Sequence, residues 1–192
     1  MHRHYGELLS RDSSQLLLID HQLTSAVAVR SMDPQRLRSN TIALARAAVS
    51  FAVPVTLTIA VKDAQQAAAP YQELAEVLIG HRIVSRETRD VWDDEGVMGS
   101  LALNARRQLV IAGLWTESAV CSSAISAMTG ANYSVFVVSD ASGGMTTESH
   151  ALACRRMSLA GARIVTLPQV TSEWQRQPLP YKARQPGSAG LA

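Results

Sequence analysis

Short apolar runs alternate with stretches of helical spacing along most of the chain. The runs carry few polar positions, which is typical of strands buried on both faces of a parallel sheet. The pattern predicts strands at 15–20, 53–58, 81–85, 108–112, 134–139 and 162–167, and helices at 34–51, 71–78, 95–107, 117–130 and 146–161. This alternation predicts an α/β fold, a Rossmann-like three-layer α/β/α sandwich with a mostly parallel sheet of about six strands.

Domain organisation follows from the same pattern. The chain has 192 residues, a length that suits one domain with a substantial core, and we expect that domain to span 1–176. From 177 to 192 the sequence QPLPYKARQPGSAGLA is rich in Pro, Gly and Ser. This composition predicts an irregular tail.

The most informative stretch runs from Gln108 to Gly143. Its first apolar run ends at Gly113, a polar turn follows, and a helix and a second apolar run complete a strand–helix–strand unit. In such a unit the turn after the first strand lies at the carboxyl edge of the sheet, where a helix N-terminus presents N–H groups to a ligand. We therefore expect the chemistry near Thr116–Cys121.

Composition restricts the choice of partners. The formal net charge is +2, and charged residues make up 18% of the chain, so neither nucleic acid nor a strongly charged surface is indicated. The sequence shows no apolar run long enough for a membrane helix and no apolar core of a signal peptide. Cys121 and Cys154 lack the spacing of a zinc site or a disulfide framework. We expect a cytoplasmic protein with no membrane partner.

Two charged residues stand where strands end. Asp20 closes the first apolar run, and its carboxylate is either a structural hydrogen-bond acceptor or a functional group, because an isolated buried charge is costly. Arg86 follows the third run and could hold a carboxylate, that of Asp20 or of a substrate. Arg86 could equally be a surface residue among the acidic side chains that follow it.

The sequence of the central strand–helix–strand unit resembles that of a known family. Gly113-Leu-Trp-Thr-Glu and Val135-Phe-Val-Val-Ser-Asp-Ala-Ser-Gly143 resemble the isochorismatase-like, or cysteine, hydrolases, with the greatest similarity to their YcaC-related branch. The resemblance covers roughly residues 14 to 175, and it implies the isochorismatase-like hydrolase fold. Family members are usually homo-oligomers, which implies a tetramer or octamer here. They act on small molecules.

The resemblance also implies roles for three catalytic positions. Asp20 matches the acid/base aspartate, and the position of the nucleophilic cysteine is held by Ala119. Counting back from Trp92 places the family's basic residue at Ser85 or Arg86; Arg86 has the suitable chemistry, and Arg89 is the reserve. Cys121 lies about 200° around a helix from Ala119, so we expect it to face the core.

Further pocket residues are expected from the same resemblance. They are Gln22, Trp92, Trp115, Thr116 and Val120, with Ala119 and Val120 offering backbone N–H groups to the substrate. The family also implies a cis peptide at Leu114–Trp115. Neither a metal nor another cofactor is expected, because residues 58–70 contain no His and no phosphate-binding glycine motif occurs.

Two functions follow from these features. The first is a metal-independent hydrolase of a small molecule, in which Asp20 acts as acid/base, Arg86 clamps charge, and cysteine-dependent amide hydrolysis is weak or absent. Isochorismatases offer a precedent, because they cleave a vinyl ether without a thiol. The alternative is an inactive family member that binds a small ligand or serves as an oligomeric assembly protein.

Overall fold

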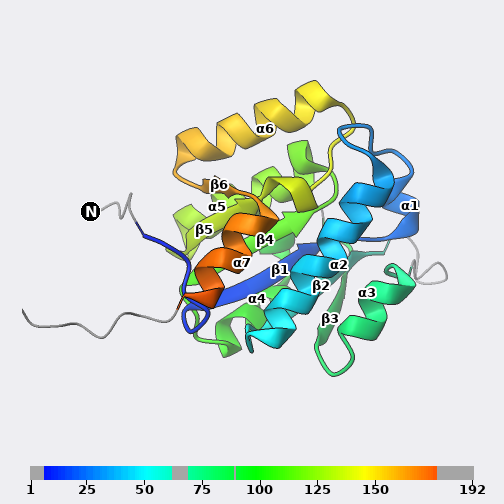
Figure 1. Ribbon diagram of the computed structural model, residues 1–192. Helices are drawn as coiled ribbons and strands as arrows, with labels where there is room; N and C mark the ends of the chain where they lie inside the picture. Colours follow the sequence, from blue (N-terminus) through cyan, green and yellow to red (C-terminus); the bar gives the residue numbers. More distant parts are fainter. Residues whose placement is uncertain (1–6, 62–68, 89, 177–192) are drawn as a thin grey trace, which may run out of the picture.

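A six-stranded parallel sheet forms the centre of the molecule. The computed structural model describes residues 7–61, 69–88 and 90–176 (Figure 1). The strands are β1 (Ser14–Ile19), β2 (Val55–Ala60), β3 (Arg82–Arg86), β4 (Gln108–Gly113), β5 (Ser134–Val138) and β6 (Arg163–Val165). They lie in the order β3-β2-β1-β4-β5-β6, and every pairing is parallel. The predicted fold class is thus confirmed.

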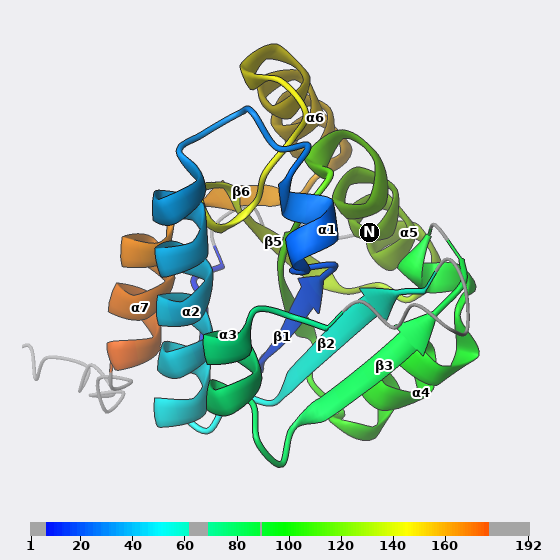
Figure 2. The same cartoon turned by 90° about the vertical axis from the view of Figure 1, so that its right-hand side faces the viewer.

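Helices cover both faces of this sheet. They are α1 (Leu23–Ala26), α2 (Pro34–Ser50), α3 (Gln72–Val77), α4 (Glu95–Leu103), α5 (Cys121–Gly130), α6 (Thr147–Ala160) and α7 (Leu167–Gln175). Figure 2 shows α2, α3 and α7 on one face and α4 and α5 on the other. Short turns at Val91–Asp93 (η1), Thr116–Val120 (η2) and Ser139–Ala141 (η3) complete the chain.

The central strand β1 explains why the chain forms three layers. Its side chains alternate between the faces: Leu16 and Leu18 join the hydrophobic cluster under α2, and Leu17 and Ile19 join the cluster under α4 and α5. All four side chains have no exposed surface. A strand buried in this way must be apolar on both faces, which is the feature that made it recognisable in the sequence.

Several boundaries differ from the prediction. The third strand extends to Arg86, so this residue ends β3 instead of following it. The helix predicted at 117–130 begins as a regular α-helix only at Cys121. Helix α1 was not predicted, and its four residues are too few to show a helical period.

The end of the described chain also differs. The sixth strand was predicted to run to Leu167, but it ends at Val165 and α7 follows at once. Pro168, directly after the predicted strand, lies in the first turn of α7, where its missing N–H is tolerated. The predicted irregular tail at 177–192 lies outside the described residues.

Candidate functional site

The candidate site lies at the point of the sheet where the strand order changes direction. From β1 the chain continues to β2 on one side, whereas β4 lies on the other side and continues to β5. Connections that leave in opposite directions open a crevice at the carboxyl ends of the two central strands. Ile19 is in register with Gly113, and the Leu114 N–H donates to the Ile19 carbonyl at 3.0 Å, so both strands end at one level.

Asp20 follows directly after β1 and is only 5% exposed. Its backbone adopts a left-handed conformation with φ of 55°, which few residues other than glycine adopt but which Asp tolerates comparatively well. The Ala60 N–H, at the end of β2, donates to Asp20 Oδ1 at 2.9 Å. One carboxylate oxygen is therefore held by the neighbouring strand.

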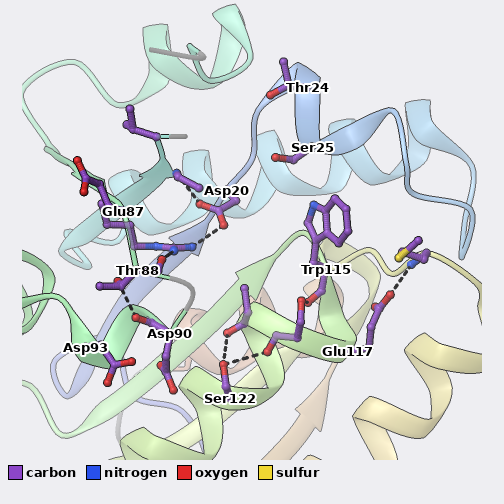
Figure 3. Close-up of a pocket in the computed structure, with 16 residues that line it drawn as sticks. Asp20, Thr24, Ser25, Glu87, Thr88, Asp90, Asp93, Trp115, Glu117 and Ser122 are labelled. Atoms are coloured by element: carbon purple, nitrogen blue, oxygen red, sulfur yellow. Dashed lines mark hydrogen bonds and ion pairs between the residues drawn. The ribbon is translucent and has the colours of Figure 1, made fainter. Parts of the chain in front are cut away.

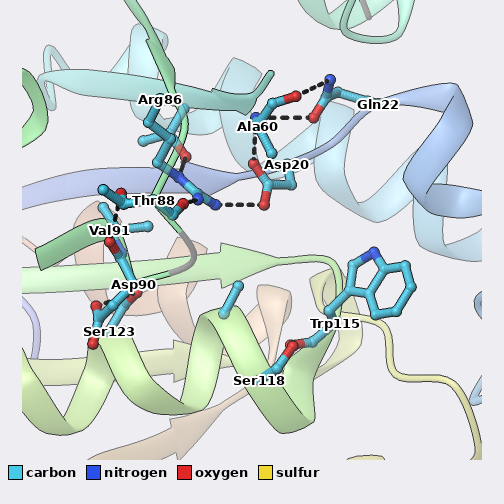
Figure 4. Close-up of polar contacts among 12 residues, drawn as sticks. Asp20, Gln22, Ala60, Arg86, Thr88, Asp90, Val91, Trp115, Ser118 and Ser123 are labelled. Carbon is cyan, nitrogen blue, oxygen red and sulfur yellow. Dashed lines mark hydrogen bonds and ion pairs between the residues drawn. The ribbon is translucent and has the colours of Figure 1, made fainter. Parts of the chain in front are cut away.

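The other carboxylate oxygen meets Arg86. Arg86 Nη2 lies 2.5 Å from Asp20 Oδ2, and the arginine also donates from Nε to Thr58 Oγ1 at 3.3 Å and from Nη1 to the Thr88 carbonyl (Figure 4). Both charged side chains are almost fully buried. Burial raises the pKa of Asp20 above its ordinary value, and the Arg86 guanidinium opposes this rise. Burial therefore favours the protonated acid, and Arg86 favours the carboxylate.

The turn after β4 has an unusual backbone. Trp115 is left-handed, with φ of 65° and ψ of 58°, and η2 is a π-helical turn. Such conformations in a bulky residue are strained and are often found at functional sites. No cis peptide bond occurs among the described residues, so the expected cis bond at Leu114–Trp115 is wrong. The left-handed Trp115 makes the sharp change of direction instead.

Gly113 allows this turn to approach β1. A Cβ on Gly113 would lie 2.7 Å from Ile19 Cβ and 2.8 Å from Val120 Cγ2, closer than real carbon atoms pack. Any larger residue would push η2 away from the end of β1. The glycine thus sets the distance between the two halves of the site.

These elements enclose a cavity of about 1070 Å³ (Figure 3). Its wall comes from the ends of β1, β2 and β3, from the segment between β3 and α4, and from η2 with the start of α5. The described lining residues are Asp20, Thr24, Ser25, Ala60, Val61, Arg86, Glu87, Thr88, Asp90, Asp93, Trp115, Glu117, Ser118, Ala119, Ser122 and Met145. Its volume lies slightly above the range of about 300–1,000 Å³ that is usual for ligand pockets.

Four of the predicted site residues line this cavity: Asp20, Arg86, Ala119 and Trp115. Three separate parts of the chain, the end of β1, the end of β3 and the η2 turn, therefore meet in one place. Ala119 is 9% exposed, and its methyl group occupies the position that the resemblance assigns to a thiol. Ser85 does not line the cavity, and Arg89 lies outside the described residues.

The other four predicted residues, Gln22, Trp92, Thr116 and Val120, do not line the cavity. Gln22 is bound to Ala60 through both its amide oxygen and its amide nitrogen, at 3.2 and 3.3 Å. Trp92 packs edge-on against Tyr133. Thr116 and Val120 are fully buried. Thr116 and Val120 do not reach the cavity because η2 presents Glu117, Ser118 and Ala119 to it instead.

The Val120 backbone N–H is also engaged. It donates to the Trp115 carbonyl at 3.5 Å, a long bond that belongs to the π-helical turn. Donation from Val120 to a substrate, as the resemblance implies, would require this bond to be given up.

Both cysteines lie away from the cavity. Cys121 is 2% exposed and packs in the hydrophobic cluster under α5, as expected from its rotation relative to Ala119. Cys154 Sγ lies 3.7 Å from His150 Nε2, and His150 Nδ1 lies 2.9 Å from Thr116 Oγ1. Burial raises the pKa of Cys154 to about 11 and lowers that of His150. Neither native thiol replaces the sulfur that Ala119 lacks.

The sequence analysis missed several lining residues. Ser122 lies one helical turn after Ala119, so its spacing could have placed it on the same face. Glu87 and Asp93 were considered only as surface partners of Arg86. Thr24, Ser25 and Met145 come from segments whose conformation no local pattern predicts.

In the described part of the chain, no group of three or more His, Cys, Asp or Glu side chains is arranged to hold a metal ion. In the same residues, no helix is both long and apolar enough to span a membrane.

A parallel sheet in this strand order, with a buried carboxylate–guanidinium pair beside a cavity at its switch point, defines an α/β protein with helices on both faces of the sheet. The isochorismatase domain model matches residues 14–169, and the chain belongs to the isochorismatase family. It is 30% identical over 168 residues to "Probable hydrolase YcaC" of Escherichia coli (strain K12). The aligned region covers 88% of this chain and 80% of that protein.

Solved structures agree with this assignment. YcaC from Pseudomonas aeruginosa, determined with hexane-2,5-diol and covalent acrylamide, matches with a TM-score of 0.85 and 29% identity over 90% of this chain and 85% of that one. Escherichia coli YcaC, an octameric hydrolase of unknown specificity, matches with a TM-score of 0.84 and 31% identity, covering 88% and 83% of the two chains. The resemblance to the YcaC-related branch is confirmed.

Proposed function

We propose that this chain is a hydrolase of the isochorismatase family that acts on a small molecule without a thiol nucleophile. One observation carries the proposal: a buried Asp20–Arg86 pair opens on a cavity beside Ala119. A carboxylate held in this way suits proton transfer, whereas a methyl group cannot attack a substrate. Water then supplies the attacking oxygen.

Each polar group has a defined task in this reaction. The raised pKa of Asp20, caused by burial, keeps its acid form available at higher pH than in water, so Asp20 can donate a proton to the substrate and later recover one from water. Arg86 keeps the carboxylate facing the cavity and stabilises its ionised form. The small side chain of Ala119 leaves room for substrate or water.

The absence of a thiol at Ala119 also favours a second function, which is ligand binding without turnover. If the reaction of this branch depends on a thiol, the chain binds a ligand in the cavity and does not turn it over. Cys121 and Cys154 do not line the cavity and offer no substitute. Turnover by the unmodified protein separates the two functions.

We also propose a homo-oligomer. Escherichia coli YcaC is octameric, and this chain covers 83% of that structure. Sedimentation of the purified protein tests the assembly state directly.

Activity assays test the proposed reaction. The purified protein is offered isochorismate and a panel of small esters, amides and vinyl ethers, before and after dialysis against a chelator. Asp20→Asn should lower turnover by about 10²–10⁴-fold, the usual contribution of a general acid or base. Asp12→Asn, in an exposed turn, is the matched control. Activity that appears only in Ala119→Cys supports the second function, and undiminished turnover in Asp20→Asn contradicts the first.

A further inference from the structure

The cavity carries an excess of negative charge. Its described lining has the carboxylates of Asp20, Glu87, Asp90, Asp93 and Glu117 and the single guanidinium of Arg86. Asp20 and Arg86 compensate each other as a close ion pair. The excess therefore remains negative.

Among the described residues, no salt bridge neutralises the remaining carboxylates. The ion pairs of the described chain join Arg38 to Glu73, Arg86 to Asp20 and Arg163 to Glu7, and none includes the other four acidic lining residues. Glu87 and Asp93 are exposed at the cavity. A cleft lined by one sign of charge concentrates ions of the opposite sign.

Two of these carboxylates are fixed by neutral donors. Asp90 accepts hydrogen bonds from the Ser123 and Ser126 hydroxyls at 3.3 and 3.1 Å, so its charge is held in place. Glu117 Oε1 accepts the Met145 N–H at 2.9 Å, and its Oε2 is buried without a hydrogen-bond partner in the described structure. Neutral donors orient these carboxylates and leave their negative charge uncompensated.

Trp115 adds a surface of a different kind. It is the aromatic residue of the described lining, and Figure 4 shows its indole well separated from Arg86. Its left-handed backbone and its contact with the cluster of Val29, Leu37 and Leu114 hold it there. An indole attracts organic cations through the negative potential of its ring face.

We propose that this cavity selects substrates that carry a small organic cation, of the ammonium type, and rejects dicarboxylates. The inference rests on the cavity being the site of the proposed function. The acidic side chains are spread around the wall and do not converge as metal ligands in the described chain, so they act as a distributed field. Trp115 provides the contact surface, and Glu87 and Asp93 provide the attraction.

Three probes of equal shape test the charge preference. Choline, its neutral analogue 3,3-dimethylbutan-1-ol and the anion 3,3-dimethylbutanoate are titrated into the full chain, and binding is followed by NMR of the probe methyl groups. Choline should bind about tenfold more tightly than the neutral probe, as for one cation–π contact aided by the field, and the anion more weakly still. Added salt should weaken choline binding alone.

Variants of the wall locate the effect. Glu87→Gln and Asp93→Asn should each weaken choline binding by about threefold and leave the neutral probe unchanged, because exposed charges contribute little singly. Trp115→Leu should reduce the preference for choline over the neutral probe. Asp12→Asn, remote from the cavity, should leave all three affinities as they are. Equal affinity for choline and the neutral probe, or tighter binding of the anion, would overturn the proposal.

Binding without turnover keeps this test separate from the proposed function. The titrations are repeated on Asp20→Asn, which cannot transfer the proton. Preference for choline in an enzyme that hydrolyses nothing leaves the cation proposal standing and refutes the hydrolase. Turnover of anionic substrates with no preference for choline does the reverse.

Discussion

Two polar clusters lie on opposite sides of the η2 turn and use burial differently. On one side, the Asp20–Arg86 pair opens on a large cavity. On the other side, Thr116, His150 and Cys154 form a chain of contacts between η2 and α6 that the cavity does not reach. The second cluster contains the more reactive types of side chain, a thiol and an imidazole. Position, and not chemical type, makes the first cluster the candidate site.

The electrostatics of the two clusters explain this difference. Arg86 provides a full positive charge beside Asp20, and this charge stabilises the ionised carboxylate inside the protein. Among the described residues no cation lowers the pKa of Cys154, and burial raises this pKa to about 11, so the thiol stays protonated at neutral pH. A neutral thiol–imidazole contact contributes to packing and does not make a nucleophile.

Removal of the cation should have the largest effect. Arg86→Met leaves the Asp20 carboxylate buried without its counter-charge, and we expect the free energy of unfolding to fall by about 3–5 kcal/mol in urea titrations at neutral pH. The double variant Asp20→Asn/Arg86→Met should recover much of this loss. Arg82→Met, at an exposed position of β3, should cost less than about 0.5 kcal/mol. A stable Arg86→Met protein would show that the pair is not coupled.

His21 tests burial without a charged partner. It lies beside Asp20 but faces the core, and burial lowers its pKa from 6.5 to about 3. On acidification below about pH 6.5, His21 therefore binds a proton in the unfolded chain but not in the folded chain. The contribution of neutral His21 to the free energy of unfolding is fully present above that pH. Acidification removes it, by roughly 2 kcal/mol between pH 6.5 and 5.

Replacement by an apolar ring isolates this effect. His21→Phe keeps a ring near Tyr71 and removes the titration, so its unfolding free energy should depend less steeply on pH in this range. His81→Gln, at a partly exposed turn, should keep the slope of the parent protein. An equal pH dependence of the unfolding free energy in the parent protein and in His21→Phe would contradict the lowered pKa of His21.

A new thiol compares the two sides of η2 directly. In Ala119→Cys the sulfur enters the cavity at a helix start, where its pKa falls relative to that of a buried thiol. Labelling with iodoacetamide, followed by mass spectrometry, should modify Cys at position 119 at least about tenfold faster than Cys121 or Cys154. Ala127→Cys, in the core, should stay unmodified in the folded protein. Comparable labelling of all three thiols would remove the distinction between the clusters.

The smallest effect is expected from the closed cluster. Cys154→Ser replaces a weak contact with His150, so stability should change by less than about 1 kcal/mol and turnover should stay the same. Urea titration and the substrate assay measure both. A marked loss of turnover would mean that the second cluster takes part in the reaction.

The sequence predicted the sheet well for a physical reason. Strands buried on both faces must be apolar throughout, and β1, β4 and β5 are therefore visible as runs without any structure. Short elements lack such a signal: β6 has three residues and α1 has four. The helix α7 was missed because Pro168 can end one element and begin the next.

The site was predicted only in part. Asp20 and Ala119 are placed by strand ends and by the resemblance, and both line the cavity. The side of a turn that faces a cavity depends on backbone angles such as those of Trp115 and on the π-helical register of η2, neither of which has a sequence signature. The prediction therefore included Thr116 and Val120, which point inward, and missed Ser118 and Ser122.

The register between β1 and β4 has a consequence for altering this protein. Asp20 and the η2 turn grow from neighbouring strands locked at Ile19 and Gly113, about one strand spacing of 4.8 Å apart. The ends of β2 and β3 are held in the same sheet, with Ala60 opposite Arg86. The rest of the wall belongs to connecting segments that share no such pairing. Changes in those connecting segments would alter which ligands enter the cavity, while the paired strands keep Asp20 and η2 in place. The fold could therefore accept new specificities without loss of this arrangement.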